Sequence, residues 1–422
     1  MRLQQELNNA ENYILRFTTA GSVDDGKSTL IGRLLYDSKS IFEDQLDAIA
    51  LASKRRGESH INLSLLTDGL RAEREQGITI DVAYRYFTTP KRKFIIADTP
   101  GHFQYTRNMV TGASTAHLAL ILVDARNGIV EQTIRHTFIA SLLGIRHILV
   151  CINKMDLVGY EEGVYLKILS SFQKLTGRLG LEDISFAPIS ALHGDNIVDR
   201  SSKMPWYEGE TVLETLETIP VSYFESGAAR FPVQYVIRPD QQKFPDYRGY
   251  AGRVSGGEIY KNQDIIVLPS GLKASVTSIH KGEMLVNSAS PGSSVAITLD
   301  RDIDIGRGNL IVPEDHLPRK DNAIEAMICW FDSTPMTTGG KYILMHATGN
   351  HKCRLEEVLS LTDINTLEEK PGRPMEMNDI GKVRIKTAQP LFFDSYSENR
   401  ITGSFILADE NSNATVAGGM II

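Results

Sequence analysis

The chain has 422 residues, of which 42% are hydrophobic, and it carries a formal net charge of −7 with a pI near 5.9. This length exceeds what one hydrophobic core usually serves, so we expect two or three domains. The acidic balance argues against a general nucleic-acid-binding surface, although a local basic patch is compatible with it. The start, MRLQQELNNAENY, is polar, and no apolar run has membrane-spanning length, so we predict a soluble cytoplasmic protein without leader or anchor. Cys151, Cys329 and Cys353 lack metal-ligand spacing and are predicted to be reduced thiols.

The first half of the chain alternates apolar runs with segments of helical character. Predicted strands lie at 94–98, 118–124, 147–153 and 185–190, and predicted helices include 29–38 and 133–144. Continuous apolar strands separated by helices are typical of a mainly parallel sheet with helices on both faces. We therefore predict an α/β domain over residues 1–222, which ends with an amphipathic helix over 205–220.

The first motif is GSVDDGKS (21–28), which fits the pattern G-x-x-x-x-G-K-[ST] at Gly21, Gly26, Lys27 and Ser28. In such a loop, backbone N–H groups face phosphate oxygens, the lysine reaches the β- and γ-phosphates, and the serine hydroxyl coordinates magnesium. Taken alone, the pattern is also compatible with a glycine turn that carries an exposed lysine. Its place between an apolar strand and a helix favours a phosphate-binding loop (P-loop).

The segment RAEREQGITIDVAYRYF (71–87) follows this loop and its helix. A threonine here, Thr79, can close over a nucleotide and ligate magnesium only when the γ-phosphate is present. By itself the segment is also an ordinary strand start. Its role as a switch therefore depends on the motifs around it.

The run FIIADTPGH (94–102) predicts a strand that ends in Asp98 and is followed by Gly101 and His102. A carboxylate at a strand end beside the P-loop can hold a magnesium-bound water, and a glycine N–H can approach the γ-phosphate closely. His102 has the position from which a side chain can orient water for attack on the γ-phosphate. A lone loop histidine is more often an ordinary surface residue, so this role depends on the order of the motifs.

The run ILVCINKMD (148–156) predicts a strand followed by the motif N-K-x-D. Asp156 can accept hydrogen bonds from both N1–H and the exocyclic amine of guanine, an arrangement of donors that adenine lacks. The pattern therefore indicates GTP, although in isolation it also fits a turn with solvated charges. Residues 190–192, after the next strand, supply backbone N–H groups to the guanine carbonyl in proteins of this layout.

Beyond residue 222 the pattern changes to short alternating segments between Gly, Pro, Asn and Asp turns, which predicts all-β structure. Examples are 231–238, 264–271 and 294–299, and the pattern returns at 323–332, 341–348, 382–391 and 402–409. We interpret 314–322 as a loop between two domains. The fold class is therefore an α/β P-loop G domain followed by two β-barrels, at 223–316 and 317–422.

Together these motifs resemble the translation-factor-related GTPases, which include elongation factor Tu, over essentially the whole chain. Within that group the sequence is most similar to the large, GTP-binding subunits of bacterial sulfate adenylyltransferase (ATP sulfurylase). The motifs that carry this resemblance are 21–38, 70–87, 91–102 and 105–114. Asp25 and the phrase DVAYRYF separate the chain from elongation factors, which usually carry His or Ala at the former place.

The resemblance implies a GTPase subunit that binds a smaller sulfate adenylyltransferase subunit, in a heterodimer or higher assembly. The smaller subunit converts ATP and sulfate to adenosine 5′-phosphosulfate and pyrophosphate, and GTP hydrolysis drives this unfavourable step of sulfate assimilation. The implied ligands are GTP or GDP and Mg²⁺, with no nucleic acid and no membrane. Implied catalytic residues are His102, Lys27 and Thr79, and implied metal ligands are Ser28, Thr79 and Asp98. Besides these, the implied nucleotide contacts are Gly21, Ser22, Val23, Asp24, Asp25, Gly26, Thr29, Thr99, Pro100, Gly101, Asn153, Lys154, Met155, Asp156, Ser190 and Ala191.

One departure from the family is Phe103, where relatives commonly have glutamate, and it bears on how the switch helix meets a partner. Some family members continue into an adenylylsulfate kinase domain, and without a second P-loop before Ile422 we expect no such activity. An alternative from another class is an elongation-factor-like GTPase that carries aminoacyl-tRNA, although the acidic composition weighs against it. A nodulation-type paralogue that makes the same activated sulfate for another pathway also stays open.

Overall fold

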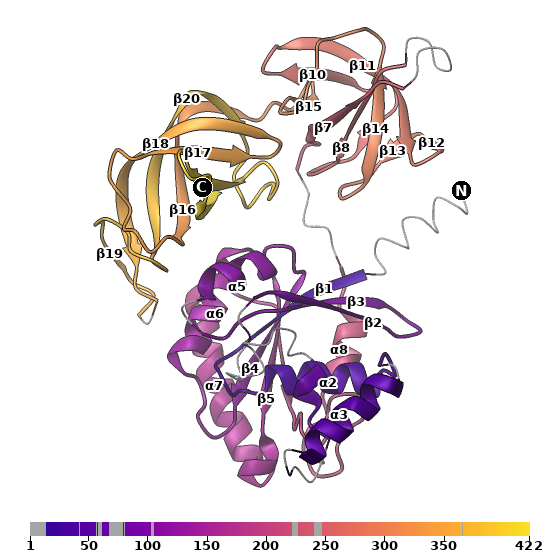
Figure 1. Ribbon diagram of the computed structural model, residues 1–422, viewed down its shortest axis with the longest axis vertical. Coiled ribbons are helices and arrows are strands. Elements are labelled where there is room, and N and C mark those ends of the chain that lie inside the picture. The colour runs from indigo at the N-terminus through magenta and orange to yellow at the C-terminus, as the bar shows by residue number, and fades with distance from the viewer. Residues whose placement is uncertain are drawn as a thin grey trace. The chain divides into compact units, whose positions relative to one another are not determined.

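The computed structural model describes residues 14–41, 43–55, 57, 61–66, 79, 81–102, 105–221, 227–239, 247–364 and 366–422. The chain forms two compact units (Figure 1), and each is described by itself. The first comprises Met1–Ser222 with Ile364–Thr366, and the second comprises Tyr223–Asp363 with Leu367–Ile422. None of the helices in the described residues combines the length and the apolar character needed to cross a membrane.

The first unit contains a six-stranded sheet in the order β2-β3-β1-β4-β5-β6. Strand β2 is antiparallel to β3, and the other strands run parallel to their neighbours. The strands are β1 (Ile14–Ala20), β2 (Ala83–Thr88), β3 (Lys93–Asp98), β4 (Leu118–Asp124), β5 (His147–Asn153) and β6 (Ile184–Pro188). The helices are α2 (Lys27–Asp37), α3 (Glu43–Arg55), η1 (Leu63–Leu66), α5 (Thr106–Ala113), α6 (Glu131–Leu142), η3 (Met155–Val158), α7 (Glu162–Leu179) and α8 (Val212–Thr218). The predicted α/β class with a mainly parallel sheet is confirmed.

The central strands of this sheet are buried on both faces. All 7 residues of β4 and all 7 of β5 are buried, which explains why both strands are continuous apolar runs. Helix α5 packs against β1 and β3, and α6 packs against β4. Helices α5, α6 and α7 lie on one side of the sheet, and α2 and α8 lie on the other (Figure 1).

The parallel strands end at one edge of the sheet. The register pairs Thr19 of β1 with Asp98 of β3, and Asp124 of β4 with Asn153 of β5. Ligands of open α/β sheets bind outside the carboxyl ends of the strands. The loops that follow β1, β3, β4 and β5 therefore begin side by side, at the edge where a ligand is expected.

The last helix of the first unit is shorter than its sequence pattern predicts. The pattern predicts a helix over 205–220, but α8 spans Val212–Thr218. The Glu214 N–H donates to the Thr211 hydroxyl, and the Thr211 N–H donates to the Glu214 carboxylate. This capping box starts the helix at Val212, and residues 205–210 lie in turns and irregular structure.

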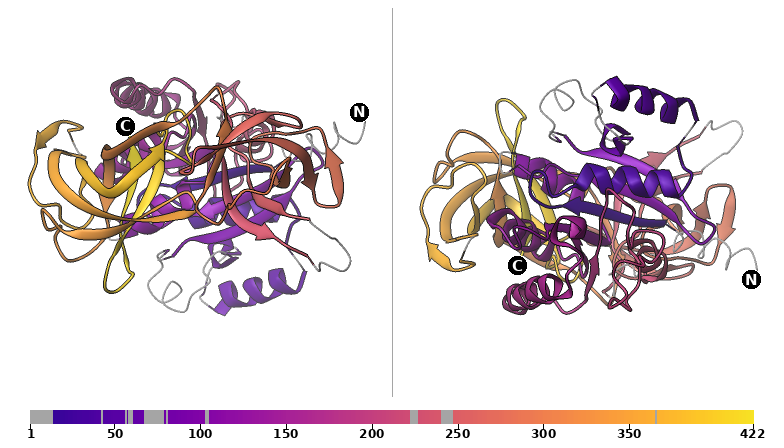
Figure 2. Two further views of the ribbon diagram at one scale, coloured as in Figure 1. Left: turned by 90° about the horizontal axis from the view of Figure 1, so that it is seen from above. Right: turned by 90° about the horizontal axis from the view of Figure 1, so that it is seen from below.

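The second unit contains two closed β-barrels. In the first, β10 pairs with both β15 and β11, which closes the order β10-β15-β7-β8-β14-β11. In the second, β17 pairs with both β21 and β18, which closes the order β17-β21-β22-β16-β20-β18 (Figure 2, orange to yellow). The two barrels predicted from the alternating sequence are therefore confirmed. Their strands are β7 (Phe231–Ile237), β8 (Gly249–Arg253), β9 (Ile259–Tyr260), β10 (Asp264–Leu268), β11 (Leu272–Lys281), β12 (Met284–Val286), β13 (Ser288–Ala289), β14 (Ser294–Leu299), β15 (Leu310–Pro313), β16 (Arg319–Trp330), β17 (Lys341–His346), β18 (Gly349–Thr362), β19 (Glu369–Pro371), β20 (Ile380–Phe393), β21 (Ser404–Asp409) and β22 (Thr415–Ile421).

The loop predicted over 314–322 is shorter in the structure, because β16 already begins at Arg319. Arg319 and Asp321 pair with Phe393 and Leu391 of β20, and the register shifts just before Ala323. The first residues of β16 are charged and exposed, so no apolar alternation marks them as a strand. Their hydrogen-bonding partner comes from a distant part of the chain. The limits at 222/223 and 316/317 stay predictions.

A buried ion pair links the two barrels within the second unit. Arg230, just before β7, donates from Nε and Nη2 to the two carboxylate oxygens of Asp394, both at 2.8 Å. The Thr402 hydroxyl also donates to this carboxylate, at 2.6 Å. Burial by itself raises the pKa of Asp394, but these hydrogen bonds outweigh it and lower the pKa. Both charged groups are thus paired and hydrogen-bonded, as buried charges require.

Candidate functional site

The P-loop, between β1 and α2, encloses the amino group of its own lysine. Lys27 is buried, and its Nζ donates to the carbonyls of Gly21 and Ser22, both at 2.9 Å. Burial lowers the pKa of Lys27, and the nearby carboxylates, Asp98 foremost, oppose that shift. Because α2 begins at Lys27, the first backbone N–H groups of the helix point into the same loop. The arrangement is the one that an anion-binding loop requires.

Gly26 and Asn153 connect the P-loop to the loops that follow β5 and β6. Gly26 has a φ of 95°, and a Cβ at this position would lie 2.4 Å from Nδ2 of Asn153. Glycine is therefore required both for the backbone conformation and for the close approach. Asn153 Nδ2 donates to the Asp25 carbonyl at 2.7 Å, and its Oδ1 accepts from the Ala191 N–H at 2.9 Å. One side chain thus joins three of the predicted motifs.

Asp156 lies in the short helix η3, directly beyond β5. The Ser190 hydroxyl donates to its Oδ1 at 2.7 Å, and Nε2 of His193 lies 4.0 Å from its Oδ2. The hydrogen bond from Ser190 holds the carboxylate in place. Because the Asp156 side chain is 14% exposed, part of it still faces solvent. The predicted pair of Asp156 and the loop after β6 is therefore brought together.

Asp124, at the end of β4, supports the N-K-x-D motif and was not anticipated from the sequence. It is buried and accepts hydrogen bonds from Arg126 at 3.0 and 2.7 Å, and Lys154 Nζ lies 2.9 Å from its Oδ2. Burial by itself raises the pKa of Asp124, but hydrogen bonds from Arg126 and Lys154 outweigh it and lower the pKa to about 2. Lys154 Nζ also donates to the Asp24 carbonyl of the P-loop. The ionised Asp124 therefore holds Lys154 against the P-loop.

The segment after β3 passes directly against the P-loop. Asp98 is 1% exposed, and the Thr19 hydroxyl donates to its Oδ1 at 3.2 Å. A Cβ at Gly101 would lie 2.6 Å from the Gly21 carbonyl oxygen and 2.4 Å from Nζ of Lys27, so only glycine allows the backbone this close. His102 follows and is half-buried. The structure therefore places Asp98 and the D-x-x-G backbone beside the predicted phosphate site.

The remaining predicted residues have unequal outcomes. Thr79 is half-buried, whereas 71–78, 80 and Phe103 lie outside the described residues, so the switch and the effect of Phe103 stay predictions. Ser28 is half-buried in the first turn of α2. The other predicted contacts belong to the loops already named: Ser22, Val23, Asp24 and Asp25 to the P-loop, Thr29 to the first turn of α2, Thr99 and Pro100 to the segment after β3, and Met155 to η3.

Two residues of α6, absent from the predicted site, hold the start of the P-loop. The Gly21 N–H donates to Nδ1 of His136 at 3.1 Å, and the Ser22 hydroxyl donates to Oε1 of Gln132 at 2.5 Å. Burial lowers the pKa of His136 to about 3, so its ring is neutral and able to accept. Gln132 and His136 are four positions apart and therefore share one helix face. No local sequence signal marks them, because their partners lie 110 and 115 residues away.

The donor groups beside the P-loop fit a magnesium ion shared with a nucleotide. Within the described residues, no group of three or more His, Cys, Asp or Glu side chains could hold a metal ion by itself. Ser28 and the buried Asp98 nevertheless place a hydroxyl and a carboxylate at this site. Magnesium is usually bound through one or two such oxygens together with waters and substrate phosphates.

The sequence matches known proteins over both compact units. Residues 12–222 match the family model "Elongation factor Tu GTP binding domain", and residues 323–422 match "GTP-eEF1A C-terminal domain-like". The chain is 50% identical over 412 residues to sulfate adenylyltransferase subunit 1 of Bacteroides fragilis, which covers 97% of this chain and 86% of that protein. It is 49% identical over 412 residues to the bifunctional enzyme CysN/CysC of Mycobacterium tuberculosis, with 97% of this chain and 67% of that protein covered. A crystal structure of sup35 complexed with GDP aligns with 97% of this chain and 94% of that chain, at 22% identity and a TM-score of 0.43.

Proposed function

Because the chain belongs to the sulfate adenylyltransferase subunit 1 family, within the elongation-factor-Tu-type GTPases, we propose that it uses GTP hydrolysis to drive formation of adenosine 5′-phosphosulfate. A smaller subunit binds ATP and sulfate and transfers the adenylyl group, and the two chains form a heterodimer or a higher assembly. A phosphosulfate anhydride lies uphill of ATP plus sulfate. GTP therefore acts because its affinity differs between the two switch states, and its phosphate does not become part of the product. The cytoplasmic location stays a prediction from the sequence.

The observation that supports the nucleotide assignment most strongly is the convergence of three loops on Asn153. Its amide contacts the P-loop carbonyl of Asp25 and the N–H of Ala191 at the same time. The neighbouring Asp156, held by Ser190, has a carboxylate free to accept from N1–H and the exocyclic amine of guanine. Phosphate contacts and base contacts are thereby held at a fixed spacing, which a GTP-specific site needs.

Different residues of the chain have separate roles in GTP hydrolysis. Lys27 holds its Nζ inside the P-loop, where it faces the β- and γ-phosphates of a bound nucleotide. Ser28 and Asp98 would hold magnesium, and Thr79 would join them when the γ-phosphate is present. When bound, that ion neutralises charge on the phosphate oxygens. His102 orients the attacking water, and the partner completes the site, which in other GTPases accelerates hydrolysis ~10³–10⁵-fold.

The full-length chain, co-expressed and purified with the smaller subunit, tests this function. We expect adenosine 5′-phosphosulfate to accumulate well above its level without GTP, and only when the GTP is hydrolysable. The matched control replaces GTP with a non-hydrolysable analogue at the same concentration. Equal product with and without GTP would overturn the proposed coupling. GTP-dependent retention of aminoacyl-tRNA in a filter-binding assay, without any sulfate adenylylation, would favour the carrier alternative.

The magnesium assignment predicts different nucleotide selectivity for two hydroxyl variants. Ser28→Ala is expected to weaken both GTP and GDP, whereas Thr79→Ala should weaken GTP and leave GDP binding nearly intact, because only the triphosphate engages the switch threonine. The GTP loss should reach at least the ~10-fold that even an outer-shell partner of a metal ligand contributes. Calorimetry with both nucleotides in Mg²⁺ measures these affinities. Ser38→Ala, at the other end of α2, is the control, and equal GDP losses in the Ser28 and Thr79 variants would contradict the switch assignment.

A further inference from the structure

The loop after β6 is held by an arginine of the helix that begins at the P-loop. Arg33 lies on α2, and its Nε donates to the Ala191 carbonyl at 3.3 Å while its Nη2 donates to the Leu192 carbonyl at 2.5 Å. The Arg33 side chain is only 19% exposed. Its guanidinium lies 5.8 Å from the centre of the Tyr36 ring and 3.6 Å from Oδ1 of Asp37. The two hydrogen bonds to the Ala191 and Leu192 carbonyls hold the guanidinium against the loop.

The two hydrogen bonds from Arg33 determine which way the peptide groups of this loop face. In a planar trans peptide, the N–H points away from the C=O of the same group. Because the Ala191 carbonyl faces Arg33, the Leu192 N–H in that peptide group points away from Arg33. The Ala191 N–H is already bound to Asn153, whereas among the hydrogen bonds of the described residues none uses the Leu192 N–H. The Leu192 N–H is therefore an available backbone donor, two residues beyond the Ser190 that holds Asp156.

We propose that Arg33 is a positioning residue for guanine recognition, because it turns the Leu192 N–H toward the oxygen at position 6 of the base. This inference rests on the proposed GTP function and deepens it. Asp156 accepts from N1–H and the 2-amine, and the loop held by Arg33 donates to the opposite functional group, O6. Arg33 acts through the loop and does not itself touch the base. Because α2 starts at Lys27, one rigid helix then sets the spacing between the phosphate contacts and the O6 contact.

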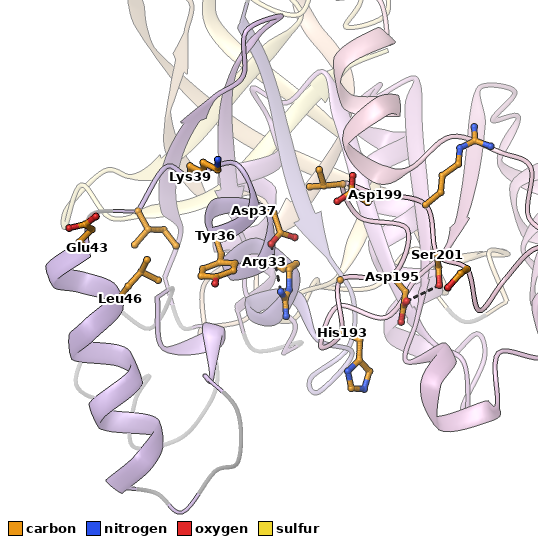
Figure 3. A pocket seen from close by; sticks show the side chains of 15 residues that line it. Arg33, Tyr36, Asp37, Lys39, Glu43, Leu46, His193, Asp195, Asp199 and Ser201 are labelled. Carbon is orange, nitrogen blue, oxygen red and sulfur yellow. Dashed lines mark hydrogen bonds and ion pairs between the residues drawn. The ribbon is translucent and has the colours of Figure 1, made fainter.

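Figure 3 shows the cleft that Arg33 lines beside this loop. Arg33, Tyr36 and Asp37 of α2 and His193 and Asp195 of the loop line an open cleft of about 860 Å³. Arg33 hydrogen-bonds the loop carbonyls, whereas the Asp37 carboxylate faces the arginine. A change at Asp37 therefore alters the same cleft without removing a hydrogen bond to the loop. Asp37→Asn is the matched control for variants of Arg33.

The test compares the affinity of each variant for nucleotides that differ at one functional group of the base. The full-length chain is loaded with a fluorescent GDP analogue, which is displaced by GTP, by ITP, which lacks the 2-amine, or by 6-thio-GTP. In 6-thio-GTP a sulfur, which is a weak hydrogen-bond acceptor, replaces O6. Arg33→Met keeps the length of the side chain but donates no hydrogen bond. We expect it to reduce the preference for GTP over 6-thio-GTP by ~5-fold, the scale of one hydrogen bond, and to leave the preference for GTP over ITP unchanged.

Two further variants make the result specific to the hydrogen bonds. Arg33→Lys, which retains a donor for one of the two carbonyls, should recover part of the GTP preference, and Asp37→Asn should keep both preferences at the wild-type values. Equal loss of affinity for all three nucleotides in Arg33→Met and Arg33→Lys, with the thermal unfolding midpoint lowered, would indicate general structural support and overturn the inference. A wild-type chain that binds none of the three nucleotides would instead overturn the proposed function itself.

Discussion

Replacement of His102 by alanine is expected to lower partner-stimulated GTP hydrolysis by about 10²-fold or more, while GTP affinity stays within a few fold. His102 directly follows Gly101, whose backbone passes against the P-loop lysine, so the segment that carries the imidazole begins beside the predicted phosphate site. A group that orients water contributes to the transition state and little to nucleotide binding. Single-turnover hydrolysis with the partner present and nucleotide titration without it measure the two quantities separately.

The same variant tests whether hydrolysis and sulfate adenylylation share one switch. Formation of adenosine 5′-phosphosulfate should fall in step with hydrolysis, and His316→Ala, which alters an exposed histidine of the second unit, should change neither. A different result is decisive: the His102 variant hydrolyses GTP slowly, yet product accumulates at the GTP-enhanced level over many turnovers. GTP would then act only as a bound activator, and the energetic coupling would be wrong even though the family assignment stands.

The second large effect is expected from Asp156→Asn, which should weaken GTP and shift the preference toward xanthine nucleotides. The amide presents a donor where N1–H and the exocyclic amine need an acceptor, and xanthine supplies an oxygen in place of that amine. One unsatisfied polar contact costs ~1–3 kcal/mol, so GTP affinity should fall by about 10-fold to 100-fold. Competitive displacement with GTP and XTP measures the change in preference.

The Asp156 result requires a control for the loss of a carboxylate as such. Asp183→Asn removes a carboxylate before β6 that pairs with His147, at the opposite end of the strand from the proposed base site. We expect it to keep the wild-type preference for GTP over XTP. GTP affinity that is unchanged in Asp156→Asn would remove this residue from the guanine site, and the assignment of the N-K-x-D motif would have to be withdrawn.

The sequence predicts the buried strands of the first unit well and the polar segment limits poorly. The runs at 118–124 and 147–153 coincide with β4 and β5, because strands buried on both faces must be apolar throughout. The helix expected over 205–220 is wrong in length, because a capping box at Thr211 and Glu214 starts α8 later. The loop expected over 314–322 contains the start of β16, whose charged residues show no alternation. In both cases local hydrogen bonding or a distant strand, and not the apolar pattern, sets the limit.

The sequence by itself determined the chemistry of the candidate site, because each motif carries its own functional groups at a fixed spacing. The lysine and serine of the P-loop, the carboxylate of D-x-x-G and the N-K-x-D carboxylate all belong to local patterns. Only the tertiary structure decided what holds those groups in place. Arg33 reaches the loop at Ala191, and His136 reaches Gly21, across 158 and 115 residues. Such contacts depend on how the helices pack on the sheet, and side-chain spacing along the chain carries no information about which distant backbone groups will meet them.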